Sequence, residues 1–333
     1  MLNFPLLQEK KEKLVVDLIN LFQIPSFLFD NDISKQYFLR ETLPNLIESV
    51  IRILSMNPAR QRRKLEKFLL EWNSMNKISA DIEAMFQTKL KTKPLSLFTQ
   101  MLSYRLIAHY MQLGFVLDLY ESNEIYEIFS SISEIFHRCQ KYEEYADVKI
   151  FPLKNKKKNS KKAIKAAEKS PSKLRIAQFS AFHSLYKALA SHSLALCKDN
   201  NLPIIPTYAQ QGRAARFLQR FYPLIRLDSF SIVVNFDEQK KRESGAPLAQ
   251  MLSSASALYK QANTDIASYS KQVPEEESKQ VQSILKSCVM NNLSAQRRLL
   301  SKEEPTKKDS SRTCISVSYE IHPLFPILSV TSW

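Results

Sequence analysis

The side chains that most often perform chemistry in proteins are few and scattered along this chain of 333 residues. None of the five histidines has a second histidine four residues away, as a metal pair on a helix requires, and no acid triad accompanies them. Positions in the core or on the surface are therefore favoured over metal ligation for His109, His137, His183, His192 and His322.

Glycine is so scarce that several classes of enzyme are disfavoured. The chain has 3 glycines, where about 7% is usual, and loops that cradle phosphate need glycine for close backbone approach. Gly212 and Ala214 fit the end of the Q/R-x-x-G-x-G/A turn of acetyl-CoA transferases, but Ala209 stands at its leading position. The sequence predicts no catalytic residue, no metal site and no bound cofactor.

The four cysteines indicate a reducing environment. Cys139, Cys197, Cys288 and Cys314 are 26 or more residues apart, so no pair has the spacing of a zinc site. The opening residues MLNFPLLQEKKEKL contain no apolar stretch followed by a small-residue cleavage site. We expect a cytoplasmic protein with free thiols.

Most of the chain is predicted to be helical, because apolar side chains recur every three or four positions. The histidines and cysteines are therefore expected to be positioned mainly by helices. Asn57-Pro58 predicts an N-cap followed by the first residue of a long helix, and Pro94 and Pro171 predict two further starts. Ser122 is a predicted N-cap, with Glu124 in the first turn of the helix that follows. The predicted helices cover residues 6–23, 34–55, 58–86, 94 to 110 or beyond, 122–136, 171–199, 208–221, 247–268 and 275–300.

Two segments have the composition of strands. "FSIVVNF" at 230–236 is β-branched and aromatic, and "CISVSYEI" at 314–321 alternates between apolar and polar residues. They are expected to pair with each other or with the sheet edge of a partner. The predicted fold is mainly α, an irregular helical scaffold of long packed helices with two or so short β-strands.

Residues 94–120 are apolar enough to raise the question of a membrane span. Arg105, His109 and Asp118 lie inside this stretch, and an ionisable residue at the centre of a bilayer costs a few kcal/mol. A helix buried in protein is therefore favoured, and no membrane partner is expected.

The net charge of +15 is concentrated in a lysine-rich segment. Residues 154–169 hold eight lysines and one acid, which suits either contact with polyanions such as rRNA or a solvated linker. We expect a helical region at 1–150, a lysine-rich disordered linker at 151–172, and a helical region with short strands at 173–333. The candidate polyanion contacts are Lys154, Lys156, Lys157, Lys158, Lys161, Lys162 and Lys165.

A second basic segment, "ARQRRK" at 59–64, opens the long helix that follows Asn57. Cations at the start of a helix oppose its dipole. These arginines are therefore expected to contact an acidic partner or nearby acidic side chains.

One glycine stands out because it lies between two long helical patterns. Gly114 is expected either to end the first helix or to mark a close contact within it. The residues around it are candidates for core packing or for a partner interface, with packing slightly favoured: Gly114, Phe115, Leu117, Asp118, Leu119, Tyr120, Glu124 and Tyr126.

The stretch "GFVLDLYESNEIYEIF" resembles the G-F-E-L-E-L-Y-x-x-x-E segment in the large auxiliary subunit of the NatC N-terminal acetyltransferase, with Val116 in place of an acid. "NPARQRRKL" is similar to that family's N-x-x-R-Q-R-x-K-L, and the lysine run occupies the place of its lysine-rich insert. Arg220, Phe221 and Pro223 resemble its R-F-x-P, and His322, Phe325 and Pro326 its closing strand. The resemblance covers the C-terminal half of a typical member.

The resemblance implies a noncatalytic scaffold. It would hold an acetyltransferase catalytic subunit, which would bind acetyl-CoA, together with a small Sm-like subunit, and help to place them at the ribosome. The complex would acetylate N-terminal methionine. Two alternatives remain open: a basic helical protein that binds RNA or the ribosome without an acetyltransferase partner, and an independent acetyltransferase.

Overall fold

The computed structural model describes residues 43–84, 94–150, 171–203, 240, 242–273, 275–300, 313–322 and 324–332. Its helices are α3 (Leu43–Leu54), α4 (Pro58–Ala84), α5 (Pro94–Val116), α6 (Ile125–Ile150), α8 (Pro171–Asp199), α11 (Leu248–Ser270) and α12 (Glu275–Leu300). Two strands follow, β1 (Thr313–Ser318) and β2 (Ile327–Ser332). The predicted mainly helical fold is confirmed, while the predicted helices at 6–23 and 208–221 and the strand at 230–236 lie outside the described residues.

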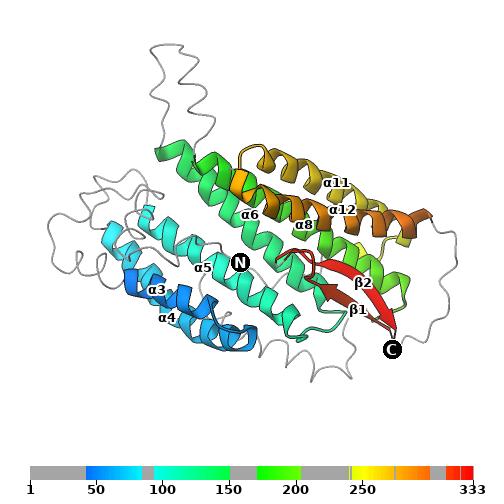
Figure 1. Cartoon of the computed structure of the whole chain (residues 1–333), viewed down its shortest axis with the longest axis horizontal. Helices are drawn as coiled ribbons and strands as arrows, with labels where there is room; N and C mark the ends of the chain where they lie inside the picture. Colours follow the sequence, from blue (N-terminus) through cyan, green and yellow to red (C-terminus); the bar gives the residue numbers. More distant parts are fainter. Residues whose placement is uncertain are drawn as a thin grey trace, which may run out of the picture.

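The helices pack in chain order into one continuous stack (Figure 1). Each described helix contacts the next one along the chain, from α3 through to α12, and α6 and α8 form the middle of the stack. Every described helix from α4 to α11 has a neighbour on both sides, so each of these helices needs apolar residues on two of its faces. On α5, Leu106 and Ile107 are both fully buried although they are adjacent in sequence.

Three proline-marked helix starts agree with the sequence. The Asn57 side-chain oxygen accepts a hydrogen bond from the Arg60 N–H at 3.0 Å, and its carbonyl accepts one from the Gln61 N–H at 2.9 Å. This is the predicted N-cap of α4. Helices α5 and α8 begin at Pro94 and Pro171, as predicted.

The two strands form an antiparallel hairpin with Thr313 opposite Ser332. The first strand was predicted at 314–321, and the structure ends it at Ser318. His322 does not lie in a strand: its ring Nδ1 accepts hydrogen bonds from the backbone N–H groups of Leu324 (3.0 Å) and Phe325 (3.2 Å) in the turn. The second strand was not predicted as a separate element.

The hairpin is fastened to helices that are distant from it in sequence. Asn291 on α12 accepts a hydrogen bond from the Leu328 N–H and donates one to the Pro326 carbonyl, both at 2.9 Å. The Tyr186 hydroxyl on α8 donates to the Leu324 carbonyl. The hairpin therefore closes one end of the helical stack.

An aromatic chain runs through the core. The ring centroids of Phe115 and Phe129 are 4.7 Å apart, those of Phe129 and Tyr186 are 5.8 Å apart, and those of Tyr186 and Phe325 are 5.2 Å apart. These contacts join α5, α6, α8 and the hairpin, and such pairs add roughly 0.5–1.5 kcal/mol each beyond their burial.

The stretch with membrane-like composition is packed inside protein. Tyr104, Leu106 and Tyr110 of α5 are buried against other parts of the chain. None of the described helices is long and apolar enough to cross a membrane.

The histidines occupy the core or its margin, in agreement with the positions the sequence favoured, and so do the cysteines. His192 is fully buried, with Nδ1 3.2 Å from the Tyr259 hydroxyl, and burial lowers its pKa to about 3. The four cysteines are free, and burial raises the pKa of Cys139 to about 12. In the described part of the chain, no three His, Cys, Asp or Glu side chains gather in a way that could hold a metal ion.

Candidate partner-binding surface

Gly114 is both the last-turn residue of a helix and a point of close contact. A Cβ atom at this position would lie 2.1 Å from the Tyr120 hydroxyl oxygen and 2.2 Å from the ring atom that carries it. The Tyr120 hydroxyl donates a hydrogen bond to the Met111 carbonyl at 3.0 Å, and the Tyr120 ring meets the edge of Phe115 with centroids 4.8 Å apart. Glycine is therefore required for the chain to fold back onto α5.

The end of α5 has the geometry of a Schellman motif. The Leu119 N–H binds the Gly114 carbonyl at 2.9 Å, and the Asp118 N–H binds the Phe115 carbonyl at 3.1 Å. Asp118 adopts the left-handed conformation, with φ of 51°, where glycine is the usual residue. Asn201 does the same after α8, also with φ of 51°. In this glycine-poor chain, polar side chains take the helix-ending position.

Helix α6 starts later than the sequence predicted. The first α-helical hydrogen bond runs from the Ile128 N–H to the Glu124 carbonyl at 3.2 Å, and the Glu124 carboxylate accepts from the Glu121 N–H at 2.9 Å. Glu124 therefore occupies the cap, and the prediction of Ser122 as the N-cap is wrong. The Ser122 hydroxyl instead accepts a hydrogen bond from the Ile315 N–H of β1 at 2.9 Å, because the hairpin lies against this loop.

The eight candidate residues around Gly114 fall into two groups. Gly114, Phe115, Tyr120, Glu124 and Tyr126 are buried, and Leu117 and Leu119 are half-buried. Asp118 is exposed, and so is its near neighbour Val116. Packing inside this chain thus accounts for the aromatic members, and the exposed carboxylate is the member that faces outward. The candidate lysines from Lys154 to Lys165 lie outside the described residues.

A buried lysine in the segment that precedes α11 was not identified from the sequence. Lys240 is 3% exposed, and its ammonium group donates to the Asn123 carbonyl at 2.7 Å and to the Glu127 carboxylate. Lys198 on α8 donates to the carbonyls of Ser244 (3.1 Å) and Ala246 (2.5 Å). These bonds fix the segment before α11 against α6 and α8.

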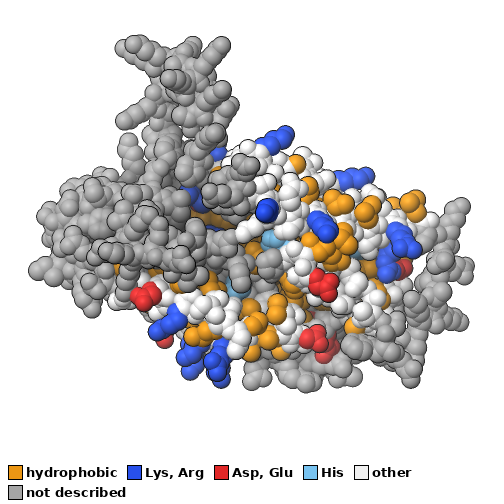
Figure 2. Space-filling view, in the orientation of Figure 1, with side chains coloured by type: hydrophobic (Ala, Val, Ile, Leu, Met, Phe, Trp, Pro, Cys, Tyr) orange, Lys and Arg blue, Asp and Glu red, His pale blue; other side chains and the backbone are white. Residues whose placement is uncertain are grey.

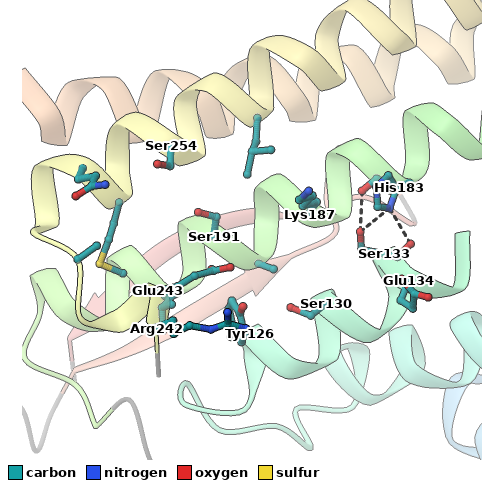
Figure 3. Close-up of a pocket in the computed structure, with 16 residues that line it drawn as sticks. Tyr126, Ser130, Ser133, Glu134, His183, Lys187, Ser191, Arg242, Glu243 and Ser254 are labelled. Atoms are coloured by element: carbon teal, nitrogen blue, oxygen red, sulfur yellow. Dashed lines mark hydrogen bonds between the residues drawn. The ribbon is translucent and has the colours of Figure 1, made fainter. Parts of the chain in front are cut away.

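The fixed segment closes one end of a groove of about 540 Å³, which we call the α8 groove (Figure 3). Helix α8 forms its floor, α6 and α11 form its walls, and many of the lining side chains are small. Along each helix the lining residues recur at helical spacing. They are Tyr126, Ser130, Ser133 and Glu134 on α6; His183, Lys187, Ala190, Ser191 and Leu194 on α8; Arg242, Glu243 and Ala246; and Gln250, Met251, Ser254 and Leu258 on α11.

The acidic side chains of the α8 groove have neighbours that engage them, whereas two basic ones do not. Glu134 pairs with Arg138 at 3.1 Å. Glu243 lies beside the buried Tyr126 hydroxyl, whose pKa is raised by burial and then by this carboxylate (Figure 3). Within the described ranges neither Lys187 nor Arg242 is paired with a carboxylate.

His183 lies at the end of the groove away from Arg242 (Figure 3). Its Nδ1 is 3.0 Å from both the hydroxyl and the carbonyl oxygen of Ser133, and burial lowers its pKa. The ring of His137 lies next to it, with centroids 4.8 Å apart. The groove residues come from four segments up to 132 positions apart (Tyr126 to Leu258), and nothing in the sequence linked them.

Comparison with known proteins reveals a family and a fold. Residues 4–328 match the family model described as NAA35-like, TPR repeats. No curated protein matches. A crystal structure of the apo NatC complex contains a similar chain, with a TM-score of 0.68 and 14% identity over 98% of this chain. A crystal structure of the NatC complex bound to Gag peptide and CoA gives a TM-score of 0.67 and 15% identity.

Both matches extend over 51% of the solved chain, so this chain spans about half the length of the chains it resembles. At these identities the likeness demonstrates a shared fold. The family model adds the family, because residues 4–328 match it. The chain therefore belongs to the family described as NAA35-like, TPR repeats.

Proposed function

We propose that this protein is a noncatalytic auxiliary subunit of a NatC-type N-terminal acetyltransferase. It would hold a catalytic subunit that binds acetyl-CoA, with a small Sm-like subunit as a further partner, in the cytoplasm. The observation that carries the proposal is the family match over residues 4–328, and the likeness to chains of NatC crystal structures supports it.

The way the chain uses its reactive side chains also supports a scaffold role. Cys139, Cys197 and Cys288 are buried and their pKa values are raised by burial, so they are poor nucleophiles at neutral pH. His192 is buried and hydrogen-bonded to Tyr259. These groups are enclosed by the stack, which fits a protein that positions other chains.

Reconstitution with a catalytic partner tests the proposal directly. The tagged chain is co-expressed with the acetyltransferase and Sm-like subunits of the same cell, and we expect a stable complex with acetyl transfer to a peptide that begins with methionine and a bulky apolar residue. The purified chain alone should transfer no acetyl group. Failure to recover an acetyltransferase subunit, or turnover by the isolated chain, would contradict the proposal.

Basic segments favour a contact with the ribosome as part of this function. Besides the lysine run, α4 carries an exposed stripe at i, i+3, i+4 and i+7: Arg60, Arg63, Lys64 and Lys67. Figure 2 shows Lys and Arg side chains gathered over α3 and α4, at the lower left. No acid lies in the first turn of α4 to offset them, and cations there oppose the helix dipole.

The salt dependence of ribosome binding distinguishes this ionic contact from nonspecific adsorption. Replacing the seven candidate lysines of the run by glutamine should weaken ribosome binding and make it less salt-dependent, by about 0.7 in slope for each lost contact with a single strand. The slope is measured by sedimentation between about 50 and 200 mM salt. RNA binding without any acetyltransferase partner would instead favour the alternative of an independent RNA-binding protein.

A further inference from the structure

We propose that the α8 groove binds an acidic, extended polypeptide segment. The proposal needs only the folded chain and does not depend on the scaffold function. It starts from the unpaired cations, because Lys187 and Arg242 both line the groove and neither has a carboxylate partner among the residues described. Both side chains are exposed, so an occupant with two separated negative charges would reach them from solvent and pair with them.

The two cations lie at different places along the groove. Ser133 is hydrogen-bonded to His183, which lies one turn from Lys187 on α8. Arg242 lies beside Tyr126, seven residues before Ser133 on α6 (Figure 3). Seven residues of α-helix span about 10 Å, and Lys187 lies one turn, about 6 Å, closer to Arg242 than His183 does, so roughly one helical turn separates the two cations along the groove (Figure 3). A compact phosphate group would need cations that converge on one point, so this separation favours an elongated ligand.

The length of the groove fits a short extended peptide. The α6 wall runs from Tyr126 to Glu134, about 12 Å of helix, and an extended chain rises about 3.3 Å per residue. Three or four extended residues would therefore fill the groove and place acidic side chains near both cations.

The lining chemistry favours an extended segment over a helix. Ser130, Ser191 and Ser254 present hydroxyl groups from three different helices. Hydroxyl groups can bind the backbone N–H and C=O groups of an extended chain, whereas a helix has used these groups internally. Apolar side chains of the ligand would contact Leu194 and Met251. The small floor residues Ala190 and Ser191 leave room for the backbone.

Matched peptide mixtures test this proposal on the full chain. One fluorescent ten-residue mixture has Glu fixed at its fourth and seventh positions, the other has Gln there, and all other positions carry mixed small and apolar residues. Fluorescence anisotropy should show that the Glu mixture binds at least about tenfold more tightly. The double variant Lys187→Ala/Arg242→Ala should abolish this preference.

Two further variants separate groove binding from general charge effects. Lys260→Ala/Lys286→Ala removes two exposed cations outside the groove and should keep the preference for the Glu mixture. Ser254→Trp fills the groove from an exposed position on α11 and should weaken binding at least tenfold. Circular dichroism and thermal melting confirm that each variant is folded.

The contrary outcomes are equally specific. Equal binding of the two mixtures, or no binding of either, would overturn the proposal, and so would a Glu preference that survives Lys187→Ala/Arg242→Ala or disappears in Lys260→Ala/Lys286→Ala. Displacement of the Glu mixture by micromolar inorganic phosphate or nucleoside triphosphate would identify a phosphate site and would also overturn it.

Discussion

The side chain of Tyr120 occupies the space in which a Cβ atom on residue 114 would lie. Gly114→Ala should displace the ring, break the hydrogen bond to the Met111 carbonyl and disturb the contact with Phe115. Overpacking costs about 1–3 kcal/mol and a lost hydrogen bond about 1 kcal/mol, against a gain in helix propensity of about 1 kcal/mol. We expect a net loss of about 2 kcal/mol in urea denaturation.

Two controls make this result specific to the contact. Gly245→Ala changes an exposed glycine without positive φ and should alter stability by less than about 0.5 kcal/mol. In a Tyr120→Ala background, Gly114→Ala should cost nothing further, because the clash has been removed. A full additive loss in the double variant would contradict this account.

His192 makes stability depend on pH. Its pKa falls from 6.5 in the unfolded chain to about 3 in the fold, because burial disfavours the charged ring and Arg298 adds repulsion. The stabilisation is complete above pH 6.5 and is lost as pH falls toward 3, since the unfolded state then binds the proton first. At pH 5 this residue alone should lower the unfolding free energy by about 2 kcal/mol relative to neutral pH.

Chemical denaturation between pH 5 and 7.5 measures this effect. His192→Gln should flatten the pH dependence, with a residual slope from His109 and His322, whose pKa values burial lowers to about 4. An unchanged slope in the variant would show that His192 is not the source.

At the scale of single residues, the sequence predicted where a residue lies along the chain's elements better than it predicted which residue it contacts. It offered two interpretations of Gly114: the close contact is confirmed, whereas the helix continues to Val116 and Asp118 takes the helix-ending position. Tyr120 could not be named as the contact, because it returns to Gly114 only after a reversal of the chain. Ser122 has the right chemistry for an N-cap, yet β1 competes for its hydroxyl. Buried Lys240 gave no signal, because a lysine in sequence normally indicates a solvated surface.

At the scale of elements, substitutions of Asp118 at the end of α5 distinguish the effect of its backbone conformation from the effect of its exposed carboxylate. Asp118 is exposed and left-handed, a conformation that costs about 1 kcal/mol for residues other than glycine. Asp118→Gly should therefore raise stability by roughly 0.5–1 kcal/mol in thermal melting. Asp118→Ala should lower it. If Asp118→Gly also loses the catalytic partner in co-purification while melting higher, the carboxylate itself is part of the interface.

The segment before α11 is held in part by the ion pair between Lys240 and Glu127. Lys240→Met would remove the ammonium group that binds the Glu127 carboxylate, and breaking a buried pair costs about 3–5 kcal/mol. Adding Glu127→Gln should recover much of that loss, because the negative charge that Lys240 compensates is then removed as well. Urea denaturation of the wild type, the two single variants and the double variant gives the coupling free energy between Lys240 and Glu127. Additive losses of stability would exclude a direct ion pair.

Helix starts were predictable wherever proline marked them, because its fixed φ suits the first helical position. The hairpin was harder: β1 was recognised from its alternation, but β2 is short and follows a turn organised by His322, a contact that needs the fold. The α8 groove could not be predicted at all. Its walls are ordinary amphipathic helices, and the hollow arises only where three faces with small side chains meet.

At the scale of the whole molecule, α12 presents an apolar outer face. Val289, Met290, Leu293 and Leu300 are 39%, 41%, 58% and 79% exposed, and hydrophobic side chains are visible over this helix in Figure 2. Contiguous exposed apolar residues often mark interaction sites. In the proposed complex we expect this face to lie against a partner subunit.

Leu293→Glu tests that expectation. It should leave thermal stability nearly unchanged, because the side chain is exposed, but reduce recovery of the acetyltransferase subunits several-fold in co-purification. Gln282→Glu adds the same charge at another exposed position of α12 and should have no effect. Normal assembly of Leu293→Glu would remove this face from the interface.

The hairpin follows in the chain every helix that it contacts, and this order matters during synthesis. Asn291, Tyr186 and Ser122 must wait for residues 315–328 before their hydrogen bonds can form. While the protein is being translated, one end of the aromatic core therefore stays uncovered and open to chaperones. The core is covered only when the two strands have been made, so ribosomes stalled before codon 313 should carry a nascent chain that proteases still cut readily.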